Sequence, residues 1–150
     1  MDFDLDKFLP YRLSLISNII SQGISDTYQK PFNLSVHEWR VVAVLGRHPY
    51  STATDIIGYT AMDKVTISRA VKRLIEKGLV ERESKDIDRR CMLINLTDKG
   101  RAIHAQVVPR VTQYEQQLFD QLSVQERQQL DRLLSKLMGI AAELNESLPT

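Results

Sequence analysis

The spacing of apolar residues changes at Gly78, and this change restricts the folds open to the chain. Over residues 64–77 apolar side chains recur every three or four positions, which predicts an amphipathic helix. The side chains expected to face inward are Ile67, Val71, Leu74 and Ile75. After Gly78 come two short strand-like runs at 79–84 and 91–96, and the second alternates with a period of two. The sequence therefore predicts a helix followed directly by a β-hairpin.

The tip of the predicted hairpin is densely charged. Its sequence, "KDIDRRC" at residues 85–91, holds five charged side chains of both signs, in a 150-residue chain whose net charge is only +1. Between Asp63 and Arg90 there are nine lysine or arginine residues and six aspartate or glutamate residues, so this window carries +3 and the rest of the chain −2. A local excess of positive charge on a helix and a hairpin is typical of a nucleic-acid-binding surface.

Long helices are predicted on both sides of this middle region. Apolar spacing predicts a helix over residues 5–29 that Pro31 stops. The capping residues that open later helices are Ser35 with Glu38, Thr52 with Asp55, Asp63, Thr97, and Ser123 with Glu126. The expected fold is mainly α with a small β-hairpin wing. Its parts are an N-terminal dimerisation helix at 1–32, a winged helix-turn-helix DNA-binding domain at 33–97 and C-terminal dimerisation helices at 98–150, because the separated terminal helices cannot bury their apolar side chains within one chain.

Several classes of function are not expected from this sequence. Cys91 is the single cysteine, which excludes an internal disulfide, and the three histidines show no metal-ligand spacing. Catalytic arrangements and phosphate-binding glycine loops do not stand out, so we expect no enzymatic activity and no cofactor. The N-terminal "MDFDLDKFLP" is acidic and polar, and we therefore expect no signal peptide, no membrane segment and a cytoplasmic location.

The helix and the hairpin together predict a winged helix-turn-helix that binds double-stranded DNA. A helix fits the major groove, where side chains in its N-terminal half reach base edges and later ones reach phosphates. An arginine at the hairpin tip would lie in the adjacent minor groove. The candidate DNA-binding residues of the helix are Lys64, Thr66, Ser68 and Arg69 for bases, and Lys72 and Arg73 for phosphates. The alternative interpretation is an ordinary surface helix followed by a solvated turn.

Two stretches of the sequence resemble the multiple-antibiotic-resistance regulator (MarR) family of bacterial transcription factors. They are "MDKVTISRAVKRLIEKGLVER" and "DIDRRCMLINLTDKG", which contain an Asp-capped helix, a Gly-Leu-Val strand entry, an Asp-x-Asp-Arg-Arg wing and a Leu-Thr-x-x-Gly exit into the next helix. The resemblance implies a homodimeric repressor, or less often an activator, that binds palindromic DNA under the control of a small ligand or an oxidant. It also implies that Arg90 enters the minor groove, that Asp88 steadies it and that Arg89 contacts phosphate.

Arg12 is a candidate for binding such a ligand. It follows Phe8 by four positions and Leu9 by three, on the predicted apolar stripe of the first helix, where an unpaired guanidinium group would be costly. Either an acidic side chain or water meets this group, or it binds the carboxylate of a small aromatic or anionic effector, as the family resemblance implies. The possible lining residues are Tyr11, Tyr28, His37, Trp39 and Arg40.

Two further alternatives stay open. Cys91 is either a structural thiol at the base of a strand, which we favour, or a sensor of oxidants, although the chain has no second cysteine to resolve an oxidised form. A winged helix can also serve in dimerisation or protein contact without DNA. The basic helix and the charged hairpin favour DNA binding over that alternative.

Overall fold

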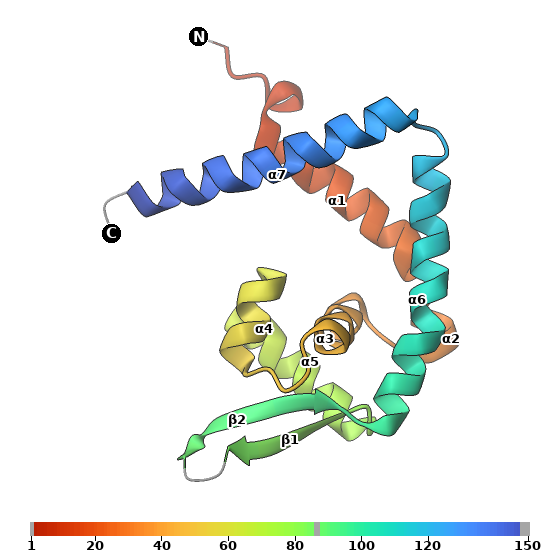
Figure 1. Ribbon diagram of the computed structural model, residues 1–150, viewed down its shortest axis with the longest axis vertical. Helices are drawn as coiled ribbons and strands as arrows, with labels where there is room; N and C mark the ends of the chain where they lie inside the picture. The colour runs from red at the N-terminus through yellow and green to blue at the C-terminus, as the bar shows by residue number, and fades with distance from the viewer. Residues whose placement is uncertain (1, 86–87, 148–150) are drawn as a thin grey trace. The chain divides into compact units, whose positions relative to one another are not determined.

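The computed structural model describes residues 2–85 and 88–147, apart from the side chains of residues 85, 88–91 and 147. In chain order its elements are η1 (Leu5–Lys7), α1 (Leu9–Ser25), α2 (Gln29–Phe32), α3 (Val36–Arg47), α4 (Ala53–Thr60), α5 (Lys64–Glu76), β1 (Val80–Lys85), β2 (Asp88–Leu96), α6 (Asp98–Phe119) and α7 (Val124–Ser147). The chain divides into two compact units, Met1–Val111 and Thr112–Thr150. The mainly helical fold with a small hairpin is confirmed (Figure 1).

The N-terminal segment is interrupted where the sequence predicts one continuous helix. Phe8, between η1 and α1, is extended with φ −73° and ψ 118°. Pro10, in the first turn of α1, lacks the backbone N–H that would continue a helix from η1. The prediction that Pro31 stops the helix is also wrong, because Pro31 lies in the first turn of α2, where no N–H is needed.

α1 ends at Ser25, and two hydroxyl groups account for this end. The hydroxyl of Ser25 donates to the carbonyl oxygen of Gln22 at 2.7 Å, and that of Thr27 donates to the carbonyl oxygen of Ile24 at 2.7 Å. Such side chains offer the last carbonyl groups of a helix a partner other than the backbone. The apolar spacing thus continues past the point where the helix stops.

Capping side chains begin the central helices where the sequence predicts them. Ser35 and Glu38 form a complete capping box at the start of α3. Thr52 and Asp55 form a second one at the start of α4. The side chain of Asp63 caps α5. Each cap satisfies backbone N–H groups that have no partner within the helix.

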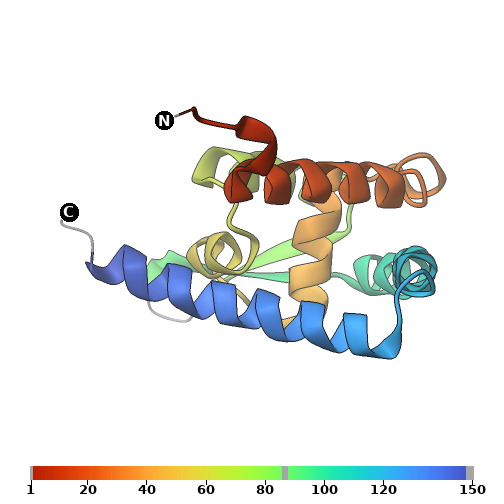
Figure 2. The ribbon, with the colours of Figure 1, turned by 90° about the horizontal axis from the view of Figure 1, so that it is seen from above.

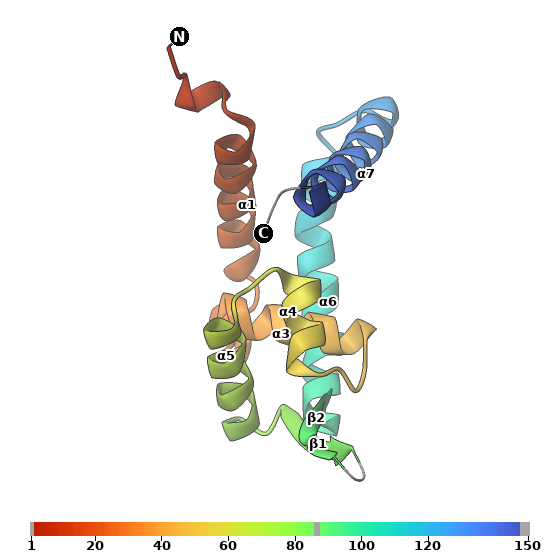
Figure 3. The ribbon, with the colours of Figure 1, turned by 90° about the vertical axis from the view of Figure 1, so that its left-hand side faces the viewer.

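The hairpin of β1 and β2 follows α5 directly. Gly78, with φ 74°, provides the left-handed residue that ends α5. An isolated antiparallel bridge between Ser51 and Ile94 ties β2 to the loop between α3 and α4. Within the first unit the hairpin projects on the side away from α1 (Figures 1 and 3).

The core of the first unit lies between α3, α4, α5 and the base of the hairpin. Val107 of α6 joins this core. α3 runs across the direction of α1 and packs against α5 (Figures 2 and 3). The residues that are at most 1% exposed include Tyr28, Leu34, Val41, Val42, Leu45, Ile56, Ile67, Val71, Leu74 and Val107. Their burial packs α5 against α3, α4 and the base of the hairpin.

The start of α6 is bonded to the end of α5 and the base of the hairpin. The hydroxyl of Thr97 accepts the N–H of Gly100 at 3.0 Å and donates to the carbonyl oxygen of Gly78 at 2.6 Å. The backbone N–H of Thr97 donates to the carbonyl oxygen of Leu79 at 3.0 Å. The predicted cap at Thr97 is therefore confirmed, and it also joins three elements.

The second unit contains the end of α6 and α7. Ser123 and Glu126 form the predicted capping box at the start of α7, with hydrogen bonds of 2.8 and 3.1 Å. The side chain of Arg127 donates to the carbonyl oxygen of Phe119 at 2.9 Å, which fixes the turn between the helices. In the described part of the chain, no helix combines the length and the apolar character needed to cross a membrane.

Candidate nucleic-acid interface

One face of α5 is buried. Ile67, Val71 and Leu74 are at most 1% exposed, as their spacing predicts. The prediction for Ile75 is wrong, because this side chain is 36% exposed and Ala70 lies in the core instead. Positions 70 and 75 lie at opposite edges of the face formed by 67, 71 and 74, and the core covers only the edge that carries Ala70.

The opposite face of α5 carries cations and hydroxyl groups. Its exposed polar residues are Lys64, Ser68, Arg69, Lys72 and Arg73, and Thr66 is half-buried. Among the described residues, no ion pair involves the lysines or arginines of this face. Their positive charge is therefore available to an anionic partner outside the chain.

The start of α5 is held in place by its cap and by the turn before it. Hydrogen bonds from Thr66, one of them 2.7 Å long from its backbone N–H, lower the pKa of the Asp63 carboxyl. Asp63 is thus ionised at neutral pH, and its charge complements the positive end of the helix. Ala61, between α4 and α5, has φ 56° and donates its N–H to the carbonyl oxygen of Ile57 at 2.9 Å. α4, this turn and α5 form a helix-turn-helix.

A hollow of about 410 Å³ lies between α5, the start of α4 and the hairpin. Its lining residues outside α5 are Thr52, Ala53, Thr54, Arg82, Met92 and Ile94, and sequence reasoning did not place them at the site. Arg82 could have been found by strand alternation, because it lies two positions after the buried Val80 and on the same face of β1. The interface is therefore broader than the helix and the hairpin tip.

The wing residues expected to contact DNA are described only by their backbone. Asp88, Arg89 and Arg90 belong to β2, but their side chains and that of Cys91 lie outside the described residues. Their roles stay predictions. The strand β1, which pairs with β2, contacts α5, so the backbone that carries these residues belongs to the same unit as α5.

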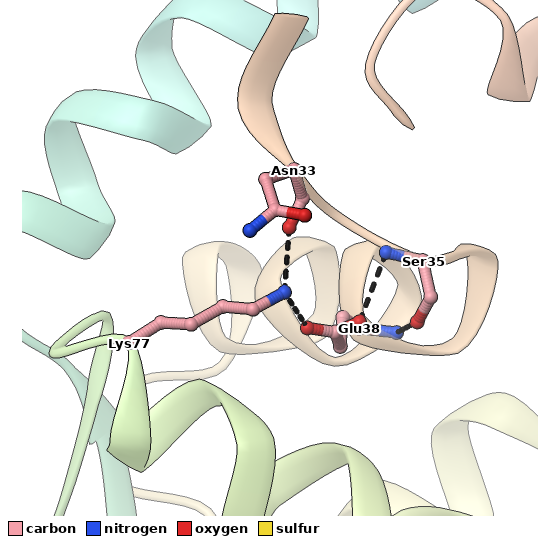
Figure 4. A network of polar contacts seen from close by, with 4 residues as sticks. All are labelled: Asn33, Ser35, Glu38 and Lys77. Carbon is pink, nitrogen blue, oxygen red and sulfur yellow. Dashed lines mark hydrogen bonds and ion pairs between the residues drawn. The ribbon is translucent and has the colours of Figure 1, made fainter. Parts of the chain in front are cut away.

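A partly buried ion pair ties the end of α5 to α3 (Figure 4). The ammonium group of Lys77 contacts Oε1 of Glu38 and donates to the carbonyl oxygen of Asn33 at 2.5 Å. Oε2 of Glu38 accepts the backbone N–H of Ser35 at 2.9 Å. The sequence predicts the capping box but not this partner, because Lys77 lies 39 positions beyond Glu38.

The ion pair sets the ionisation of Glu38. Burial alone would raise the pKa of this carboxyl, but hydrogen bonds from Lys77 and Ser35, together with the Lys77 charge, outweigh burial and lower the pKa below its ordinary value. Glu38 is therefore charged at neutral pH and is neutralised by Lys77. Both ends of α5 are thus fixed by an acidic side chain.

The structure brings together only some of the residues predicted to line an effector site. The rings of Tyr28 and Trp39 are in contact, with centroids 5.7 Å apart. Arg40 donates to the hydroxyl of Ser21 at 3.4 Å. Burial raises the pKa of the Tyr28 hydroxyl, and the nearby charge of Arg40 opposes that increase. Tyr28 is 1% exposed and belongs to the core, whereas Trp39 and Arg40 are half-buried.

Tyr11, Arg12 and His37 are exposed and lie outside that group. Phe8 and Leu9, the apolar neighbours of Arg12, are 45% and 47% exposed. The desolvation cost that singles out Arg12 in the sequence does not arise within one chain.

The described residues provide no metal site, since no three His, Cys, Asp or Glu side chains among them gather closely enough to hold an ion. His37 instead has its Nδ1 atom 3.3 Å from the sulfur of Met62. The ring of His104 packs against Trp39 with a centroid distance of 6.0 Å. Both histidines therefore take part in packing.

The helix-turn-helix and its adjoining hairpin correspond to a known family. A model of the MarR family matches residues 32–90. A MarR/EmrR family transcriptional regulator from Acinetobacter sp. ADP1 superposes with a TM-score of 0.85 and 27% identity, over 94% of this chain and 99% of that one. The chain is similar to MarR-family regulators over most of its length, and the family model matches its winged helix. The sequence resemblance to MarR proteins is thereby confirmed.

Two other comparisons concern regulators of transcription. The homoprotocatechuate degradative operon repressor of Escherichia coli is 25% identical over 120 residues, which cover 80% of this chain and 81% of that repressor. A mutant of Escherichia coli MarR in complex with operator DNA superposes with a TM-score of 0.78 and 25% identity, over 91% of this chain and 99% of that one. The chain is therefore similar, in its winged helix and beyond it, to proteins that regulate transcription.

Proposed function

We propose that this regulator acts in the cytoplasm as a homodimer that binds a palindromic operator. In each chain, α5 enters a major groove and the hairpin lies over the adjacent minor groove. The observation that carries the proposal is the exposed cationic face of α5, which lies opposite a buried face and next to the hairpin.

The proposed DNA contacts follow from position along α5 and the wing. Contacts to base edges come from Lys64, Thr66, Ser68 and Arg69. Contacts to phosphates come from Lys72, Arg73 and the wing residue Arg89. Arg90 enters the minor groove, and Asp88 orients it. Because both ends of α5 are already fixed, little conformational freedom is lost when these contacts form.

Exposed apolar side chains on the terminal helices support dimerisation. On α1, Leu9, Leu13 and Ile16 are between 43% and 49% exposed, and on α7, Leu133 and Leu137 are 47% and 36% exposed. Apolar surface of this extent marks a protein interface. We propose a second copy of the chain as the partner, because a two-fold symmetric dimer presents two α5 helices to the two halves of a palindrome.

A fluorescence titration with a labelled DNA duplex tests this function. Wild-type protein should bind two chains per duplex, and affinity should fall steeply between about 50 and about 200 mM salt. Arg90→Ala should weaken binding to every sequence and reduce the salt slope by about one. Arg69→Ala should cost about 1–3 kcal/mol on the preferred site and relax base preference.

Lys30→Ala, which removes an exposed cation of α2, is the control and should bind as wild type does. If binding does not depend on salt, the chain is a protein-interaction module rather than a DNA-binding one. If Arg69→Ala weakens binding but Arg90→Ala keeps the wild-type affinity and salt slope, the wing assignment is wrong.

We further propose that the regulator is a repressor released by a small aromatic or anionic effector. The half-buried side chains of Trp39 and Arg40, next to the buried ring of Tyr28, support such a ligand, and Arg12 supplies an exposed cation on α1. The relative from Escherichia coli is a repressor, which supports the sign of regulation. An effector that favours a dimer with a different distance between its α5 helices would weaken operator binding, and the operator would weaken effector binding equally.

Benzoate and its hydroxylated derivatives are suitable probes for the effector site. A bound acid should raise the melting temperature of the protein and release it from the duplex. If the guanidinium group of Arg12 or Arg40 binds the carboxylate, replacing that arginine with alanine should lower the affinity for the acid by about tenfold. The rise in melting temperature and the release from DNA should then both need more acid. An unchanged response in both variants would place the site elsewhere.

A further inference from the structure

An apolar residue stands in the middle of the cationic face of α5. Val65, the second residue of the helix, is 58% exposed. Arg69 and Lys72 follow it by four and seven positions, so the three side chains share one stripe of the helix. This stripe lies opposite the buried residues Ile67 and Val71. Val65 therefore occupies the centre of the outward face, in the turn nearest the N-terminus.

Nothing within the described part of the chain accounts for a valine at this position. Val65 contributes neither to the buried core nor to the lining of the hollow beside the hairpin. A β-branched residue is also a poorer helix former than the lysine, arginine or alanine found elsewhere in α5. Its exposed methyl groups are therefore available to a partner outside the chain.

We propose that Val65 is a specificity-determining residue that packs against the 5-methyl group of a thymine in the major groove. This inference rests on the proposed function, in which α5 enters that groove. Among the groups that base pairs present there, the thymine methyl is the apolar one, and the others donate or accept hydrogen bonds. The N-terminal turn of a recognition helix is also the part whose side chains reach base edges.

The residues near Val65 on α5 indicate which DNA bases would lie next to the thymine. Ser68 and Arg69 provide hydrogen-bonding groups for polar base edges, while Lys72 lies one turn further along the same stripe. A thymine opposite Val65 would lie next to the bases that Ser68 and Arg69 contact. Burial of one methyl group corresponds to an affinity difference of about three- to fivefold.

Replacement of thymine by deoxyuridine tests the inference directly, because the two bases differ only by the methyl group. Selection from randomised duplexes with wild-type protein supplies the preferred site, and each thymine in it is then replaced in turn. Each half-site should contain one thymine whose replacement weakens wild-type binding by about three- to fivefold. With Val65→Ala, the same replacement should have no effect on affinity, while the salt slope stays unchanged.

Lys72→Ala is the matched control on the same stripe. It should weaken binding to the thymine and deoxyuridine duplexes by the same factor and should lower the salt slope. The melting temperature of Val65→Ala should be equal to or slightly above that of the wild type, because alanine is the better helix former, and this separates loss of a contact from loss of folding.

Two results would overturn the inference. Either no deoxyuridine replacement weakens wild-type binding, or the sensitive positions remain sensitive in Val65→Ala. In both cases DNA binding itself would stand. A wild-type protein that binds no duplex in a salt-dependent manner would instead remove the proposed function on which the inference depends.

Discussion

Replacing Gly100 with alanine should prevent folding or cost about 3 kcal/mol or more of stability. Gly100 is buried in the first turn of α6, and a Cβ atom there would lie 2.0 Å from the carbonyl oxygen of Leu79. That oxygen is also held in place by the N–H of Thr97, at 3.0 Å. Because the clash is with backbone and not with a flexible side chain, α6 would have to separate from the base of the hairpin.

Chemical denaturation of the full chain, followed by circular dichroism, measures this loss. Gly58→Ala is the matched control, because Gly58 lies in α4 of the same unit and a Cβ there would meet no atom within 4 Å. That variant should be more stable than wild type by about 0.5–1 kcal/mol. A Gly100→Ala protein as stable as wild type would mean that α6 does not approach Leu79 this closely.

Lys77→Met should destabilise the first unit by about 3 kcal/mol. Methionine keeps much of the volume of lysine but removes the ammonium group that neutralises Glu38, whose side chain is only 3% exposed. The carboxylate would then be buried with Ser35 as its remaining partner among the contacts described for it. Since the Lys77 side chain is 29% exposed, water can reach its place, and we expect a cost at the low end of the range for broken buried pairs.

The pH dependence of the same variant separates loss of the ion pair from loss of packing. In the wild type the pKa of Glu38 is lowered in the folded state, so its contribution to stability is present above the ordinary value of 4.5 and is lost as the pH falls through the lowered folded pKa. Without Lys77, burial dominates and the folded-state pKa rises. The stability deficit of Lys77→Met should therefore shrink as the pH falls from neutral through that raised pKa.

Denaturation at several pH values measures both effects. Lys72→Met, which changes an exposed lysine on the other face of α5, should alter stability by no more than about 0.5 kcal/mol at any pH. A deficit of Lys77→Met that stays constant with pH would show that an ionised Glu38 is not its origin.

The beginnings of the central helices are predictable because their determinants are local. A capping box needs only two residues three positions apart, and the boxes at Ser35 and Thr52 form as the sequence predicts. The N-terminal helix is different. Apolar spacing favours one helix, but Pro10 and the hydroxyl groups of Ser25 and Thr27 divide the segment. Periodicity describes which side of a helix is buried and not where the helix breaks.

The sequence predicts those features of the candidate site that depend on a single helix. Periodicity predicts the buried and exposed faces of α5, and the exposure of its cations agrees with that prediction. Contacts between distant segments need the folded chain. The Leu-Thr-x-x-Gly pattern draws attention to Gly100, but only its distance to Leu79 explains the glycine. The ion pair of Lys77 with Glu38 has no local sequence determinant at all.

The hydrogen bonds of Thr97 also have a mechanical consequence. They join the first turn of α6 to Gly78 and Leu79, and the ammonium group of Lys99 adds a bond to the carbonyl oxygen of Lys77 at 3.3 Å. A rotation of the first turns of α6 would therefore break these bonds unless the end of α5 and the base of the hairpin moved with it. In the proposed complex, a displacement of the start of α6 would thus reach α5 and the hairpin together.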